Sequence, residues 1–283
     1  MHENKKKVGL ALGSGGVKGL AHVGVIKALN RHNIRIDYIA GASIGAWVGA
    51  HYAIYKNIDK LETFTIGKKK EKLHSMFELT LKGGFIKGDK IEHLFEQWLG
   101  DTEFKDTLIP LKIVATELLS GKEIVLSEGK IAPAVRASMG VPSVFAPYKY
   151  LEMILIDGGV CNPVPADVVR KMGADVVISV NLDNYRLDEL FEKKDVNSIT
   201  HVTSRSIDLL RHYLAKHCVK TSDVVIEPEN AHEALAKWRN YFTHDIGNEH
   251  LRLGEEATEK ILPQINALLK SQIKPMTADS KNQ

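Results

Sequence analysis

The sequence predicts an α/β fold of three layers, with helices on both faces of a mostly parallel sheet. Short apolar runs typical of buried strands alternate along the chain with amphipathic segments typical of helices. The runs at 8–12, 153–156 and 176–180 are apolar almost throughout. Strands of this kind are buried on both faces, as in a parallel sheet between two helical layers.

The first element pair is a strand at Val8–Leu12 and a helix that begins near Leu20, joined by the glycine-rich loop Gly13–Gly19. A loop of this kind presents backbone N–H groups beside a helix N-terminus, where negative charge is favoured. It therefore suits either a nucleotide phosphate or the oxyanion of an acyl-transfer reaction.

The nucleotide alternative fits the residues poorly. The phosphate-loop pattern G-x-x-x-x-G-K-[ST] fails because Lys18 is followed by Gly19, and G-x-G-x-x-G counted from Gly13 requires glycine where Lys18 stands. Asp37 does lie about twenty positions on, where the dinucleotide fingerprint has its ribose ligand.

The second strand–turn–helix unit carries a serine at its turn. An apolar run ends at Ala40, and Gly41-Ala42-Ser43-Ile44-Gly45 leads into a segment of small residues at helical spacing. In G-x-S-x-G the glycines leave room for a sharp turn that exposes the serine hydroxyl. Ser43 is therefore either a nucleophile or an incidental serine in a glycine-rich connection.

The stretch 55–105 is charged and helix-prone, and we expect a helical insertion there. It contains the lysine run Lys68–Lys70 and an apolar helical repeat that ends at Trp98. The lysines suit a solvated face, a membrane-surface element or a lid.

The remaining elements follow the same alternation. We expect a hairpin at 111–127, a helix at 132–138, strands at 153–156, 176–180 and 224–226, and a long amphipathic helix over 246–269 that Pro263 kinks or divides. The first of these strands runs into Asp157-Gly158-Gly159. We expect one domain over 1–275 and a flexible tail over 276–283.

Composition excludes several classes of protein. The 283 residues carry a net charge of +3, which is too mild to indicate nucleic-acid binding. The cysteines Cys161 and Cys218 form no disulfide framework, and no Cys/His spacing indicates a metal site. No apolar run approaches the ~20 residues of a membrane span, and the first one is too short for a signal peptide. We expect a soluble cytoplasmic protein; the sequence gives no indication of its oligomeric state.

The glycine loop, Ser43 and Asp157 each follow a predicted strand. Loops after the strands of an open α/β sheet meet at one edge, where ligands bind. A nucleophile, free N–H groups and a carboxylate at that edge are the minimum set for acyl transfer.

These blocks together resemble the patatin-like phospholipase family. Its signature is G-G-x-[KR]-G, G-x-S-x-G, D-G-[AG] and A-S-x-x-x-P. The chain has these blocks at 15–19, 41–45, 157–159 and 137–142. It looks most like the compact bacterial members, which are similar to the catalytic part of neuropathy-target-esterase-type proteins. Ser14 stands where many relatives have glycine.

The resemblance implies a Ser–Asp dyad that hydrolyses acyl esters of phospholipids or lysophospholipids. Ser43 would attack the ester, Asp157 would accept its proton, and the N–H groups of Gly15 and Gly16 would form the oxyanion hole. The other residues of the signature that would support the site are Gly13, Lys18, Gly19, Gly41, Gly45, Gly158 and Gly159. This chemistry requires neither metal nor organic cofactor. Transient contact with a membrane surface is compatible with it.

Three alternatives stay open. A Ser–His–Asp triad is available because six histidines follow Asp157 in the sequence, namely His201, His212, His217, His232, His244 and His250. The fold could instead serve as a non-catalytic module that binds lipid or a protein partner. A carboxylesterase for soluble esters would use the same residues as a lipid hydrolase.

Overall fold

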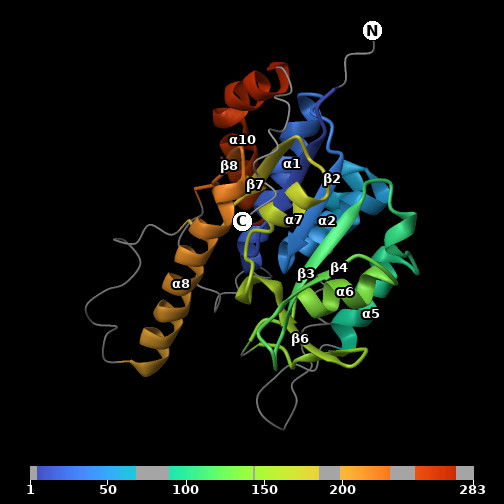
Figure 1. The fold of residues 1–283 in the computed structure, drawn as a ribbon, viewed down its shortest axis with the longest axis vertical. Helices are drawn as coiled ribbons and strands as arrows, with labels where there is room; N and C mark the ends of the chain where they lie inside the picture. Colours follow the sequence, from blue (N-terminus) through green and yellow to red (C-terminus); the bar gives the residue numbers. More distant parts are fainter. Residues whose placement is uncertain (1–4, 68–88, 143, 185–197, 230–245, 272–283) are drawn as a thin grey trace, which may run out of the picture.

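The computed structural model describes residues 5–67, 89–142, 144–184, 198–229 and 246–271, and these form a three-layer α/β structure (Figure 1). Its eight-stranded sheet has the order β5-β6-β3-β2-β1-β7-β8, with β4 also paired to β3. The strands are β1 Val8–Leu12, β2 Tyr38–Ala42, β3 Leu111–Glu117, β4 Glu123–Leu126, β5 Tyr148–Tyr150, β6 Met153–Asp157, β7 Val176–Val180 and β8 Val224–Ile226.

The strand directions confirm a mostly parallel sheet and add an antiparallel end, at β6 and β5, that was not predicted. The pairs β1–β2, β1–β7, β2–β3 and β7–β8 are parallel. The pairs β3–β4, β3–β6 and β5–β6 are antiparallel. The predicted strands at 8–12, 176–180 and 224–226 have the bounds of β1, β7 and β8. Strand β5, which is only half-buried along two of its three residues, was not predicted.

Helices cover both faces of this sheet. They are α1 Ala21–Arg31, α2 Ile44–Tyr55, α3 Ile58–Glu62, α5 Asp89–Leu99, α6 Ile131–Ser138, α7 Ala166–Lys171, α8 Ile199–Cys218 and α10 Ile246–Lys270. Side chains alternate along β1, so that Leu10 and Leu12 face a large core with α1, α2, α5, α6 and α10. Ala11 faces a smaller core that includes α7 and the end of α8.

Helix α10 packs on α1 with their backbones almost in contact (Figure 1, red and blue). A Cβ atom on Gly24 would lie 1.9 Å from the carbonyl oxygen of Leu251, and one on Gly254 would lie 2.0 Å from that of Ala21. Only glycine permits this approach at both positions. The long helix predicted over 246–269 is a single helix, Ile246–Lys270, and Pro263 lies inside it without dividing it.

The described parts of the stretch 55–105 are helical and join the main core. Leu61 of α3 and Leu94, Phe95 and Trp98 of α5 are all buried there. Residues 68–88, which include the lysine run, lie outside the described residues, as does the tail 276–283. The domain bounds and a lid role for 55–105 therefore remain predictions.

None of the described helices combines the length and the apolar character that crossing a bilayer requires.

Candidate active site

Ser43 occupies the sharp turn between β2 and α2. Its backbone has φ 56° and ψ −125°, a left-handed conformation that a non-glycine residue rarely adopts. The turn is tight on both sides: a Cβ on Gly41 would lie 2.4 Å from the carbonyl oxygen of Gly45. One on Gly45 would lie 2.2 Å from that of Leu12. The two glycines of the pattern are therefore steric requirements of the turn that presents Ser43.

The Ser43 hydroxyl donates a hydrogen bond to Asp157, with 2.5 Å between Oγ and Oδ2. The other carboxylate oxygen, Oδ1, accepts the backbone N–H of Gly159 at 2.7 Å. Both Ser43 and Asp157 are buried. The carboxylate is thus held at both oxygens, one of them facing the serine.

Asp157 reaches Ser43 by a different route from the one that the sequence analysis assumed. Strand β6 runs antiparallel to β3, so its carboxyl end does not follow the direction of the parallel strands. Asp157 pairs with Ala115, whereas Ala42, just before Ser43, pairs with Val114. Strand β6 therefore approaches from beyond the sheet edge and ends at the level where β2 ends.

Burial raises the pKa of the Asp157 carboxyl to about 6. The hydrogen bond from Ser43 and the positive charge of Arg211 oppose this rise, and the negative charge of Asp183 adds to it. A carboxylate with a raised pKa is a better acceptor for a serine proton, and at pH 7 it is still mostly ionised. A carboxyl with this pKa is a stronger base than an exposed aspartate.

The glycine loop lies between the serine turn and the aspartate turn. A Cβ on Gly19 would lie 2.2 Å from Cγ2 of Ile44, next to Ser43, and one on Gly159 would lie 2.6 Å from Oγ of Ser14. The N–H groups of Gly13 and Ser14 donate to the carbonyls of Val180 and Pro163, which anchors the start of the loop.

The next two amides of the loop have no such anchor. Within the described part of the chain, neither the Gly15 nor the Gly16 N–H donates to another residue. Gly16 is left-handed, with φ 59°. Both N–H groups are thus without a protein acceptor among the described residues.

Ser138 supports the serine turn in a way that the sequence analysis missed. The Ser43 N–H donates to Oγ of Ser138 at 2.8 Å, and that hydroxyl donates to the carbonyl of Val114 at 2.6 Å. Ser138 is fully buried at the end of α6. The block at 137–142 therefore fixes the backbone of Ser43 against β3, and its A-S-x-x-x-P motif was the available signal.

A family model described as patatin-like phospholipase matches residues 10–170, more than half of the chain. The chain belongs to the patatin-like phospholipase family. The matched range contains the glycine loop, Ser43, Ser138 and Asp157.

Named relatives agree with this assignment. An NTE family protein of Mycobacterium tuberculosis is 34% identical over 178 residues, which cover 62% of this chain and 49% of that protein. The lysophospholipase NTE1 of Scheffersomyces stipitis is 31% identical over 185 residues, which are 63% of this chain and 12% of that protein. The matching region thus spans half or less of either relative.

A solved structure supports the fold. The crystal structure of VipD from Legionella pneumophila superposes with a TM-score of 0.60 over 92% of this chain and 67% of that chain, at 13% identity. At this identity the likeness concerns the fold alone. It confirms the predicted patatin-like α/β/α fold.

None of the described histidines of this patatin-like chain hydrogen-bonds to Ser43 or Asp157. His22 donates from Nε2 to the carbonyl of Gly13, and burial lowers its pKa to about 4. Of the six later histidines, His212 contacts the Asp183 carbonyl, and His232 and His244 lie outside the described residues. Among the described residues, no group of three His, Cys, Asp or Glu side chains is placed to hold a metal ion.

Proposed function

We propose that the chain is a serine acyl-ester hydrolase that acts on lipids, with Ser43 as nucleophile and Asp157 as general base. The observation that carries the proposal is the buried hydrogen bond of 2.5 Å between the Ser43 hydroxyl and the Asp157 carboxylate. The sharp, positive-φ turn that carries Ser43 and the pKa of about 6 of Asp157 support the same assignment.

The reaction uses groups of this chain alone. Ser43 Oγ bonds to the ester carbonyl carbon while its proton passes to Oδ2 of Asp157. The carbonyl oxygen becomes an oxyanion, which accepts hydrogen bonds from the N–H groups of Gly15 and Gly16. Collapse of this intermediate breaks the bond to the alcohol, which takes the proton from Asp157. Water then attacks the acyl-enzyme by the same route, and the acid and Ser43 are released.

The substrate class rests on the family and its relatives. Phospholipid or lysophospholipid esters are favoured because the matching family is described as a phospholipase family and fungal relatives are named lysophospholipases. The protein would act in the cytoplasm, at the surface of a membrane or a micelle.

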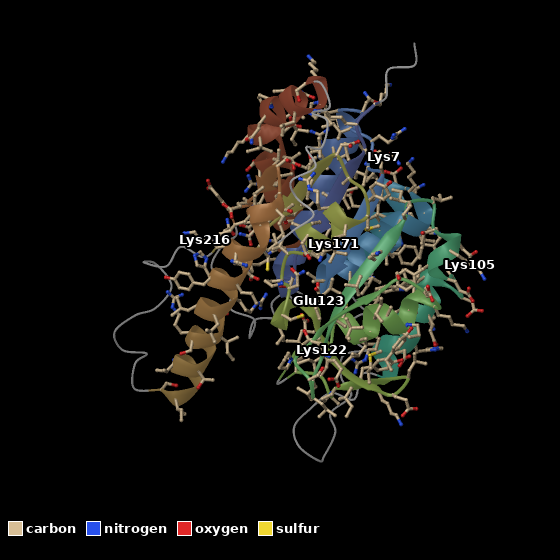
Figure 2. All side chains as sticks on the ribbon, viewed as in Figure 1. Lys7, Lys105, Lys122, Glu123, Lys171 and Lys216 are labelled. Atoms are coloured by element: carbon tan, nitrogen blue, oxygen red, sulfur yellow. The ribbon has the colours of Figure 1, made fainter. Side chains whose placement is uncertain are left out.

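Two turns beyond the site suit contact with such a surface. Strand β3 continues past the level of Asp157 into a turn that carries Leu118 and Leu119, and Leu118 donates its N–H to the Ile154 carbonyl of β6. Leu119 is 79% exposed, and Leu151, in the turn between β5 and β6, is 76% exposed. Lys122, beside the first turn, lies at the opposite end of the sheet from Lys7, at the start of β1 (Figure 2). Exposed leucines at the same end of the sheet as the candidate site favour an apolar surface as partner.

Labelling by a fluorophosphonate probe tests the proposal. The wild type is compared with Ser43→Ala, Asp157→Asn and Ser206→Ala, the last an exposed serine on α8. We expect the wild type and Ser206→Ala to label, and both site variants to fail while they remain folded by circular dichroism. If Asp157→Asn labels at the wild-type rate, the base lies elsewhere. A wild type that does not label even with lipid micelles present would favour the non-catalytic module.

A second measurement concerns the substrate class. If the turnover of lysophospholipid increases sharply above its critical micellar concentration, the protein is a lipid hydrolase and not a carboxylesterase for soluble esters.

A further inference from the structure

The segment that follows β7 lies directly against the glycine loop. A Cβ on Gly15 would lie 2.8 Å from Cβ of Leu182, so the loop and this segment meet backbone to side chain. The ammonium group of Lys18 donates to the Leu182 carbonyl at 2.6 Å. The loop residues on both sides of Gly16 are therefore held by the chain just beyond β7.

Asp183, the next residue, joins Ser14 of the loop to Arg211 of α8. The Ser14 hydroxyl lies 3.3 Å from Oδ2 of Asp183. Nη2 of Arg211 lies 3.2 Å from Oγ of Ser14, and 3.0 and 3.1 Å from the two carboxylate oxygens of Asp183. The Asp183 side chain is 1% exposed and that of Arg211 15%. Ion pairs shielded from water in this way are strongly sensitive to removal of one partner.

Asp183 is itself held on two further sides. Its N–H donates to Oδ1 of Asn181 at 3.0 Å, and its carbonyl accepts Nδ1 of His212 at 2.8 Å. His212 and Arg211 are neighbours on α8. This helix therefore binds both the backbone carbonyl and the side-chain carboxylate of Asp183. These hydrogen bonds fix the position of the Asp183 carboxylate that contacts Ser14.

We propose that Arg211 and Asp183 are positioning residues for the oxyanion hole, and that the Ser14 hydroxyl transmits their hold to Gly15 and Gly16. The proposal rests on the proposed function, because it assigns these residues a role in the same reaction. An oxyanion hole accelerates a reaction only if its N–H groups are already aligned. A loop with glycines at 13, 15, 16 and 19 has many accessible backbone conformations, so alignment must come from outside it.

The same residues also act on the aspartate turn. Ser14 Oγ lies beside Gly159, since a Cβ there would approach it to 2.6 Å, and the Gly159 N–H donates to Asp157. The charge of Arg211 lowers the pKa of Asp157, and that of Asp183 raises it. Loss of the arginine charge should therefore move the acid limb of the activity profile to higher pH.

The test compares Ser14→Ala, Arg211→Gln, Arg211→Lys and the double variant Ser14→Ala/Arg211→Gln with the wild type. Lys216→Gln, on the same helix, is the matched control (Figure 2). Hydrolysis of a soluble p-nitrophenyl ester gives kcat and KM as functions of pH. We expect Ser14→Ala and Arg211→Gln each to lower kcat about tenfold or more with little change in KM. The double variant should lose no more than Arg211→Gln alone. Arg211→Lys should restore the pH limb but not kcat.

Hydrogen–deuterium exchange of peptides over 13–20 provides a readout independent of turnover. The proposal requires faster exchange there in Arg211→Gln than in the wild type and in Lys216→Gln. Unchanged exchange in the loop, or losses of kcat that add in the double variant, would overturn it. A wild type that neither labels nor hydrolyses esters contradicts the proposed function, whereas the exchange result still decides whether Arg211 orders the loop.

Discussion

Ser43 and Asp157 are separated by 114 positions in the sequence, yet their side chains share a hydrogen bond of 2.5 Å inside the protein. The two residues belong to separate elements that are not adjacent in the sequence. Ser43 is placed by the turn after β2, and Asp157 by an antiparallel strand that ends one pairing position further along β3. The catalytic proposal therefore depends on the register of three strands as much as on the two residues.

The pH dependence of hydrolysis should report on Asp157. The carboxyl must be ionised to accept the Ser43 proton, and its pKa is raised to about 6. We expect kcat/KM on a soluble ester to rise with pH through that value and then reach a plateau near neutral pH. An acid limb near pH 4 would instead indicate that Asp157 is as accessible to water as an ordinary surface aspartate.

The free energy of unfolding should also depend on the ionisation of Asp157, but it should fall with rising pH where the activity rises. Because the pKa of Asp157 is higher in the folded protein than its usual 3.8, the folded state holds this proton more tightly. The contribution to stability is fully present below about pH 4 and is lost as pH rises through about 6. A rise from 3.8 to about 6 corresponds to ~3 kcal/mol. We expect Asp157→Asn to raise the Tm at pH 7 and to lose that advantage near pH 4. A lower Tm at pH 7 would contradict this.

Much of the fold could be predicted because its central strands are apolar almost throughout. The runs at 8–12 and 176–180 have the bounds of β1 and β7, since strands buried on both faces carry few polar residues that could obscure their ends. The direction of β6 could not be predicted in this way. An apolar run indicates that a strand is buried, but it carries no information about the direction of the strand. The antiparallel pairing of β6 with β3 therefore became visible only in the structure.

The candidate site was predictable where residues act through local geometry. The glycines around Ser43 follow from the turn itself, and their spacing is a signature of it. Ser14, Asp183 and Arg211 carry no such signature, because they meet only after β7 and α8 have packed beside the loop. Ser138 lies between these cases: its motif was recognised, but its hydrogen bond to the Ser43 N–H depends on where α6 ends.

Ser138→Ala should impair both stability and catalysis. The change removes the acceptor of the Ser43 N–H and the donor to the Val114 carbonyl, and it leaves both groups buried. An unsatisfied buried backbone group costs about 1–3 kcal/mol. We expect a lower midpoint in urea unfolding and a reduced kcat, because the strained turn of Ser43 loses a support. Ser120→Ala, at an exposed turn, is the control. A variant with wild-type kcat would show that the turn holds without Ser138.

Leu119→Ser and Leu151→Ser should separate surface binding from chemistry. Both leucines are largely exposed, on turns at the end of the sheet where Asp157 lies, so their substitution leaves the core intact. Transfer of a leucine side chain from water to an apolar phase is worth about 1.5–3 kcal/mol, so each loss should weaken adsorption roughly tenfold or more. Sedimentation with phosphatidylcholine vesicles measures binding, and a soluble p-nitrophenyl ester measures chemistry. We expect vesicle binding and lysophospholipid turnover to fall in both variants, while hydrolysis of the soluble ester stays at the wild-type level. In the control Leu210→Ser, on α8, we expect vesicle binding and soluble-ester hydrolysis both to stay at the wild-type level. Equal losses on both substrates would instead place these turns in the active site, and unchanged vesicle binding would remove them from the lipid contact.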